Sequence, residues 1–245
     1  MKWNQTDAAM YEQWEKSQKG AFALEQEKKL VLSLISNWRR RHQSLLEVGC
    51  GTGFFLETLW EAGFSVTGLD CSPAMLAKAR SRLGRHVDLH LGWAENLPFE
   101  DNEFDYVMLI TLLEFCPDPV EVVKEAARIC KKEMLIGFLN RYSCYYLTNG
   151  MALRKHSSSP LNNASWKSWP QMRRMINKAV GQRNLHAGSV LPGPKVSWRK
   201  KMLCYRLNGH IYPPFCGAFG AVVVDLAWKP TGTPLLAWAP QPKAT

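Results

Sequence analysis

The chain has 245 residues and a formal net charge of +10, a length that allows a full hydrophobic core and favours one elaborated domain over two equal ones. No apolar run approaches the roughly 20 residues of a membrane-spanning helix, and Lys2 to Gln18 is too polar for a signal peptide. The seven cysteines are scattered without a C-x-x-C pair. We therefore expect a cytoplasmic protein with reduced thiols and no metal site.

The positive charge is confined to the C-terminal part of the chain. Up to Asn149 there are 17 Lys and Arg against 20 Asp and Glu, whereas after it 14 Lys and Arg stand against Asp225 alone. Such a region could face an anionic substrate, nucleic acid, an anionic membrane surface or an acidic partner, or could simply be a basic surface.

Residues 1–43 precede the first predicted strand. Apolar residues recur at helical spacing from Glu25 to Trp38, which predicts an amphipathic helix with one buried stripe. Before it, Tyr11 and Trp14 stand in a polar segment. We expect an N-terminal helical segment outside the sheet.

Three glycines at alternate positions follow a short apolar strand. Leu45 to Val48 runs into Gly49, Gly51 and Gly53, and an apolar-periodic segment comes next. This pattern predicts a strand, a tight turn and a helix N-terminus, where main-chain N–H groups bind nucleotides. The dinucleotide fingerprint would place a sixth-position glycine where Phe54 stands, and no Gly-Lys-Ser/Thr is present, so neither a dinucleotide site nor a P-loop is indicated.

The second predicted strand, Ser65 to Leu69, ends in Asp70, about twenty residues beyond the glycine turn. A carboxylate at this position is placed to accept hydrogen bonds from both ribose hydroxyls of a nucleotide. Ser72 and Pro73 then start a helix as N-cap and first residue. Met75, on the first turn of this helix, can pack on the base of such a nucleotide, an adenine.

Further strands are predicted at Val87 to Leu91, Phe104 to Ile110, Met134 to Leu139, His186 to Val190 and Gly220 to Trp228, with helices at Val120 to Cys130 and Trp169 to Val180. Strands that alternate with helices predict an α/β protein with a doubly wound, mostly parallel seven-stranded sheet and helices on both faces. The interval of about 190–219 is long for a connection, and we expect it to cover the substrate. We divide the chain into an N-terminal segment (1–43), a main domain (44–228) and a proline-rich tail (229–245).

Three segments resemble motifs of the class I S-adenosylmethionine-dependent methyltransferases, which have a Rossmann-like fold. Glu47-x-Gly-x-Gly-x-Gly53 resembles motif I, and Asp70 to Leu76 looks like the second motif. Gly92 to Phe99 resembles a segment of the ubiquinone and menaquinone biosynthesis methyltransferases, with Trp93 in place of their aspartate. The resemblance implies S-adenosylmethionine as cofactor, bound by Glu47, Gly49, Cys50, Gly51, Gly53, Asp70, Cys71, Met75, Trp93, Ala94, Glu95 and Thr111.

The replacement of the aspartate by Trp93 changes the expected adenine contact. In the family that acid accepts a hydrogen bond from the adenine amino group. Glu95 or a backbone carbonyl could take its place, and Trp93 could stack on the purine ring.

The resemblance also suggests acceptor-site residues. It implies that the N-terminal segment folds over the cofactor as a lid, with Tyr11 and Trp14 facing the site. Polar groups after the fifth strand are candidate substrate contacts, as is an aromatic residue of the cover; these are Asn140, Arg141, Tyr142 and Tyr212. A thiol or phenol acceptor would need a base, for which Glu114, His210 and Tyr11 are the candidates.

These patterns predict a methyltransferase that acts on a small molecule, anionic or aromatic, under a basic and aromatic C-terminal cover. Two alternatives remain. The basic residues and aromatics could bind RNA, although no Asn/Asp-Pro-Pro-Tyr tetrapeptide follows the fourth strand. The chain could also be a non-catalytic partner subunit with the same fold. The oligomeric state cannot be inferred from the sequence.

Overall fold

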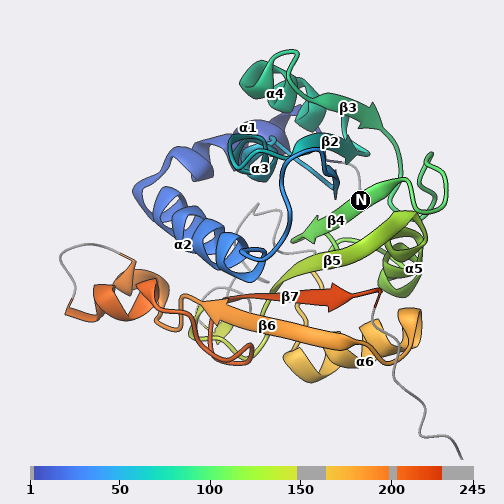
Figure 1. Cartoon of the computed structure of the whole chain (residues 1–245). Coiled ribbons are helices and arrows are strands. Elements are labelled where there is room, and N and C mark those ends of the chain that lie inside the picture. The colour runs from blue at the N-terminus through green and yellow to red at the C-terminus, as the bar shows by residue number, and fades with distance from the viewer. Residues whose placement is uncertain (1–2, 148–163, 199–202, 228–245) are drawn as a thin grey trace, which may run out of the picture.

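The computed structural model describes residues 3–147, 164–198 and 203–227, so the predicted tail at 229–245 lies outside the described residues. A seven-stranded sheet runs through the molecule in the order β3-β2-β1-β4-β5-β7-β6 (Figure 1). The strands are β1 (Ser44–Val48), β2 (Ser65–Asp70), β3 (Asp88–Leu91), β4 (Phe104–Ile110), β5 (Cys130–Leu139), β6 (Asn184–Val190) and β7 (Phe219–Asp225). The first five pair in parallel, whereas β7 is antiparallel to both β5 and β6. The predicted mostly parallel seven-stranded sheet is confirmed.

Helices cover both faces of this sheet, as predicted (Figure 1). They are α1 (Gln5–Lys16), α2 (Gln18–Leu34), α3 (Phe54–Glu61), α4 (Pro73–Leu83), α5 (Pro119–Ile129) and α6 (Trp169–Val180), with 3₁₀ helices η4 (Lys195–Ser197) and η5 (Leu203–Gly209). Successive strand residues point to opposite faces. In β4, Met108 joins the core under α2 and α3, whereas Val107 and Leu109 join the core under α5 and α6.

The parallel register brings three strand ends together. Val48 of β1 pairs with Leu69 of β2 on one side and with Leu109 of β4 on the other. The chain segments that follow these strands therefore meet at one edge of the sheet. Open α/β sheets bind ligands at this carboxyl edge.

Two polar contacts, one buried and one solvent-exposed, fix the N-terminal helix α1 over that edge. The carboxylate of Glu15 in α1, which is almost fully buried, pairs with Arg82 of α4 (N···O 2.8 Å) and accepts the hydroxyl hydrogen bond of Thr52. Glu12 pairs with Lys78 at 2.6 Å. Because both acids lie on α1 and both cations on α4, these contacts hold α1 against the body of the domain.

Within the ranges of residues that the structure describes, the points of interest are membrane-spanning helices, disulfides and metal sites. No helix there has the length and apolarity to cross a bilayer. Six of the cysteines in these ranges, all except Cys204, form no disulfide, and the described residues hold no cluster of His, Cys, Asp and Glu side chains suited to a metal ion.

Candidate functional site

A cavity of about 720 Å³ lies at the carboxyl edge of β1, β2 and β4. Its lining includes every predicted cofactor residue except Gly53. The predicted lid residues Tyr11 and Trp14 also line it, on α1. The structure thus brings together three motifs and the N-terminal segment around one space.

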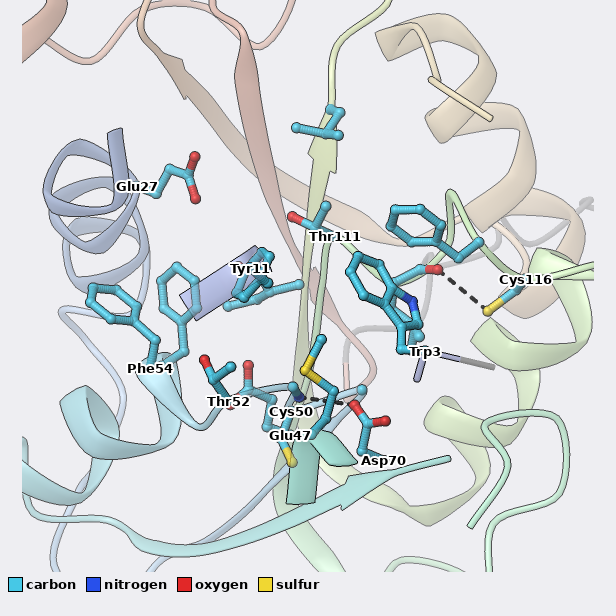
Figure 2. Close-up of a pocket in the computed structure, with 18 of the residues that line it drawn as sticks. Trp3, Tyr11, Glu27, Glu47, Cys50, Thr52, Phe54, Asp70, Thr111 and Cys116 are labelled. Carbon is cyan, nitrogen blue, oxygen red and sulfur yellow. Dashed lines mark hydrogen bonds between the residues drawn. The ribbon is translucent and has the colours of Figure 1, made fainter. Parts of the chain in front are cut away.

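The glycine turn after β1 approaches the cavity with its main chain. Gly49 (φ +74°) and Gly51 (φ +53°) adopt left-handed conformations that favour glycine. A Cβ on Gly49 would come within 2.7 Å of Leu112 Cδ1. The Gly51 N–H donates to Asp70 Oδ2 at 2.9 Å, which joins the turn to the end of β2 (Figure 2).

Asp70 is a buried carboxylate with two main-chain donors. Its Oδ1 accepts from the Ser72 N–H at 2.8 Å and its Oδ2 from Gly51. Burial raises the pKa of this carboxyl, and the backbone N–H donors oppose the rise. Each carboxylate oxygen has a second lone pair, so the group can still accept from two ligand hydroxyls.

Glu47, at the end of β1, is the strongest sign that a ligand donor belongs here. Its side chain is only 2% exposed, it lines the cavity, and its Oε2 has no hydrogen-bond partner. Burial, with the nearby Asp70, raises the pKa of this carboxyl well above its usual range. A buried acceptor without a donor is costly, and an ammonium donor from a bound ligand would remove the cost. These groups therefore fit the amino-acid end of S-adenosylmethionine.

Aromatic side chains and a methionine line the end of the cavity beyond Asp70. Met75 is buried on α4, and Trp93 is half-exposed. Trp3 and Phe115, which the sequence analysis missed, meet edge to face there with ring centroids 5.4 Å apart. Trp3 is held by its carbonyl, which accepts from the Ser72 hydroxyl at 2.7 Å. A purine would find apolar surfaces for stacking here.

Gly53 serves helix packing and not the cavity. It caps α3 with φ +81°, and a Cβ there would lie 2.9 Å from Leu83 Cδ1 and 3.1 Å from Ala79 Cβ. Both neighbours belong to α4. Gly53 is therefore outside the cavity lining and lets α3 and α4 approach closely, and its contact with the cofactor stays a prediction.

We expect Gly53→Ala to lower the free energy of unfolding by about 2 kcal/mol, because the new methyl group meets both a positive φ and a crowded helix contact. Urea unfolding measures the loss. Cofactor affinity of the folded variant should stay within about threefold of the wild type by titration calorimetry. A normal stability with a large loss of affinity would restore Gly53 to the binding site.

The opposite end of the cavity is formed by segments that are far apart in the sequence. Glu27 of α2, Tyr145 after β5, and Lys195 and Trp198 of the predicted cover all line it, and the sequence analysis missed these residues as site groups. Among these residues, only Glu27 could have been identified as buried from the sequence. It lies three, four and seven residues before Leu30, Val31 and Leu34, so it belongs to the buried face of an amphipathic helix.

Five predicted acceptor-site residues do not reach the cavity. Asn140 is fully buried, but its amide donates to the Gly217 carbonyl at 3.0 Å and accepts from the Tyr142 N–H at 3.1 Å, so it holds a turn. The Tyr212 hydroxyl donates to a main-chain carbonyl at 2.9 Å. Outside the cavity lie Asn140, Arg141, Tyr142, His210 and Tyr212, of which Arg141, Tyr142 and His210 are exposed on the surface.

The candidate base Glu114 does not line the cavity either, although its neighbour Phe115 and its hydrogen-bond partner Leu139 do. Its buried Oε1 accepts the Leu139 N–H at 2.6 Å, which ties the loop after β4 to the end of β5, and its Oε2 has no partner. Burial raises the pKa of this carboxyl to about 7. The hydrogen bond to the Leu139 N–H gives Glu114 a structural role that does not require proton transfer.

We expect Glu114→Gln to leave methyl transfer within about threefold of the wild type. The substitution should instead change how the stability of the protein depends on pH. The folded-state pKa of Glu114 is raised, so the wild type loses stability as the pH rises from about 4.5 through 7, whereas glutamine does not titrate. Between pH 5 and pH 8 the free energy of unfolding of the wild type should therefore fall by about 1 to 2 kcal/mol relative to that of the variant. Thermal unfolding of both proteins over this pH range measures the difference. A hundredfold loss of activity would contradict the structural role.

Tyr11 lines the cavity from α1, where it packs on Trp14 with ring centroids 5.5 Å apart. Burial, with the carboxylates of Glu15 and Glu27, raises the pKa of its hydroxyl above the usual value. The hydroxyl therefore stays protonated at neutral pH. It suits a hydrogen-bond donor better than the base predicted from sequence.

Comparison with known proteins identifies the family to which the chain is similar. The family described as a methyltransferase domain matches residues 46–136. An uncharacterised protein of Methanocaldococcus jannaschii is 33% identical over 149 residues, which cover 60% of this chain and 67% of that protein. The ubiquinone biosynthesis O-methyltransferase of Thiobacillus denitrificans is 38% identical over 111 residues, covering 43% of this chain and 48% of the relative. The chain thus spans two thirds of the first and about half of the second.

A solved structure shares the fold over nearly the whole chain. It is described as a methyltransferase dependent on S-adenosylmethionine, possible histamine N-methyltransferase, from Thermotoga maritima. It matches with a TM-score of 0.68 and 24% identity, covering 90% of this chain and 97% of the other. The chain belongs to the class I S-adenosylmethionine-dependent methyltransferases, and S-adenosylmethionine is its cofactor.

Proposed function

We propose that this protein transfers the methyl group of S-adenosylmethionine to a small molecule bound in the part of the cavity farthest from Asp70. The observation that carries the proposal is the shape of the cavity. From the glycine turn it continues past Thr111 to a wall made by Leu191, Trp198 and Phe219. A volume of about 720 Å³ is in the range of small-molecule sites.

The residues on the cofactor side have separate tasks. The main chain of the glycine turn and Glu47 would hold the amino-acid end, Asp70 the ribose, and Met75 with Trp93 the purine. The cofactor supplies an electrophilic methyl group. The chain's contribution is then to place an acceptor in line with the methyl–sulfur bond and to exclude water. The lid helix α1 and the segment at 190–219 would provide that exclusion.

The excess of acidic over basic groups in the cavity lining gives no support to an anionic acceptor. Within the described lining, Glu27, Glu47, Asp70 and Glu95 face a single cation, Lys195. The basic residues of α6 instead lie exposed on the face opposite α2; they are Arg173, Arg174 and Lys178. The C-terminal excess of positive charge therefore gives little support to an anionic substrate or to RNA held in this cavity. The name of the ubiquinone biosynthesis relative supports a small-molecule acceptor.

A labelled-methyl assay tests the proposal. The protein would be incubated with methyl-labelled S-adenosylmethionine and, separately, with thiols, phenols, amines, quinone precursors or bulk RNA. Label should appear in at least one small-molecule class and not in RNA. Label in RNA alone would overturn the acceptor class. Absence of cofactor binding in a calorimetric titration would identify a non-catalytic subunit.

A further inference from the structure

Glu27 places a carboxyl on the buried face of α2. Leu30 and Val31, three and four residues later, are fully buried, and Glu27 itself is 9% exposed. The carboxyl lines the cavity, and Figure 2 shows it on the opposite side from Asp70. This separation puts Glu27 in the acceptor part of the site.

The described residues provide no hydrogen bond or ion pair to the Glu27 carboxyl. Burial alone raises its pKa to about 8. Buried carboxyls normally have partners, as Glu15 does in Arg82 and Glu114 in the Leu139 N–H. A buried acid in a cavity without such a partner suggests that the partner is a ligand.

Two tyrosines lie near this carboxyl. Tyr11 and Tyr145 lie close enough for the Glu27 charge to raise the pKa of both hydroxyls, although burial is the larger cause. Tyr145 packs on Trp198 with ring centroids 4.9 Å apart. Lys195 lies over the Tyr145 ring, with Nζ 5.9 Å from the ring centre. A carboxylate among aromatic faces is a site for an ammonium group.

We propose that Glu27 binds the ammonium group of the methyl acceptor, which is a primary or secondary amine on an apolar or aromatic frame. The inference rests on the proposed function and specifies its substrate class. The apolar frame would lie against Trp14, Trp198 and Phe219, which line the same end of the cavity.

In the proposed methyl transfer, Glu27 is the first proton acceptor, and every proton and electron pair is accounted for. The bound ammonium gives one proton to the carboxylate and becomes a neutral amine. The amine nitrogen then forms a bond to the methyl carbon while the methyl–sulfur bond breaks and sulfur keeps the electron pair. The product is a methylated ammonium ion beside a neutral thioether. Glu27 returns its proton to water when the product leaves.

The test uses the full chain saturated with S-adenosylhomocysteine and three probes of similar shape. Phenethylamine, phenethyl alcohol and phenylacetate differ mainly in charge. Their affinities would be measured by calorimetry for the wild type, Glu27→Gln and Glu27→Asp, with Glu114→Gln as a matched buried-carboxyl control. The wild type should bind the amine at least tenfold more tightly than the alcohol. Glu27→Gln should lose that preference, whereas Glu114→Gln should keep it.

Methyl transfer to the same amine gives a second readout. Glu27→Gln should lower kcat/KM for phenethylamine at least tenfold while its affinity for S-adenosylmethionine stays within threefold of the wild type. Equal binding of amine and alcohol by the wild type, or an unchanged preference in Glu27→Gln, would overturn the inference. If the protein binds the cofactor and methylates phenols or thiols but no amine, the inference fails and the proposed function stands. Loss of cofactor binding in the wild type would instead remove the proposed function.

Discussion

Asp70→Ala is expected to weaken S-adenosylmethionine binding by about 1.5 to 3 kcal/mol, or roughly 10- to 150-fold, the usual worth of hydrogen bonds to a charged group. The variant removes the acceptor for the ribose hydroxyls. It also releases the N–H groups of Gly51 and Ser72, which Asp70 now holds at 2.9 and 2.8 Å. The loss should therefore lie toward the upper end of this range. Titration calorimetry with the cofactor and with S-adenosylhomocysteine measures it.

Asp105→Ala is the matched control for this experiment. Asp105 lies near the start of β4, at the opposite edge of the sheet, where it accepts from the Ser44 N–H at 3.0 Å and pairs with Lys132 at 2.9 Å. Its removal should cost stability while the folded protein binds the cofactor as the wild type does. A folded Asp70→Ala protein with affinity within twofold of the wild type would refute the assigned role.

Glu15→Ala should destabilise the fold by about 2 to 4 kcal/mol, below the 3 to 5 kcal/mol typical of a fully buried pair because Arg82 is partly exposed. The change leaves the Arg82 guanidinium and the Thr52 hydroxyl without the carboxylate that they share. Because Glu15 joins the lid helix to α4, we also expect the cofactor to dissociate about tenfold faster. Urea unfolding and stopped-flow displacement measure the two effects.

Glu12→Ala separates the buried contact from the surface one. Glu12 lies on the same helix and pairs with Lys16 and Lys78, and these lysines lower the pKa of its carboxyl to about 2. This ion pair is solvent-exposed, so its removal should change stability and dissociation only slightly. Equal effects of the two substitutions would show that α1 is held by its total charge and not by the Glu15 contact.

The sequence predicts the cavity residues at the strand ends better than those of the proposed acceptor half, for a physical reason. Gly49 and Gly51 lie in the turn after β1 and Asp70 is the last residue of β2, and the parallel register carries strand ends to a common edge. A local pattern is then enough to place them. Gly53 belongs to the same pattern but packs against α4, because a glycine permits close helix contact as readily as ligand approach.

The acceptor half depends on contacts that no local pattern contains. Glu27 and Tyr145 come from separate segments and meet only in the folded chain. Conversely, Asn140 and Glu114 follow strands as site residues do, yet the Asn140 amide and the Glu114 Oε1 bind main-chain groups, and neither residue lines the cavity. Sequence places such residues near a site but does not tell which polar atoms remain available. Periodicity within α2 was the one signal that could have singled out Glu27.

The position of β7 has a consequence for how the protein matures during synthesis. This strand is the last described one in the chain, yet it lies between β5 and β6 and pairs with both along its whole length. A ribosome must therefore release Phe219–Asp225 before β6 gains a neighbour and before Phe219 can close the acceptor wall. Strands β1, β2 and β4, which carry the predicted cofactor residues to the cavity, are all synthesised earlier than this wall.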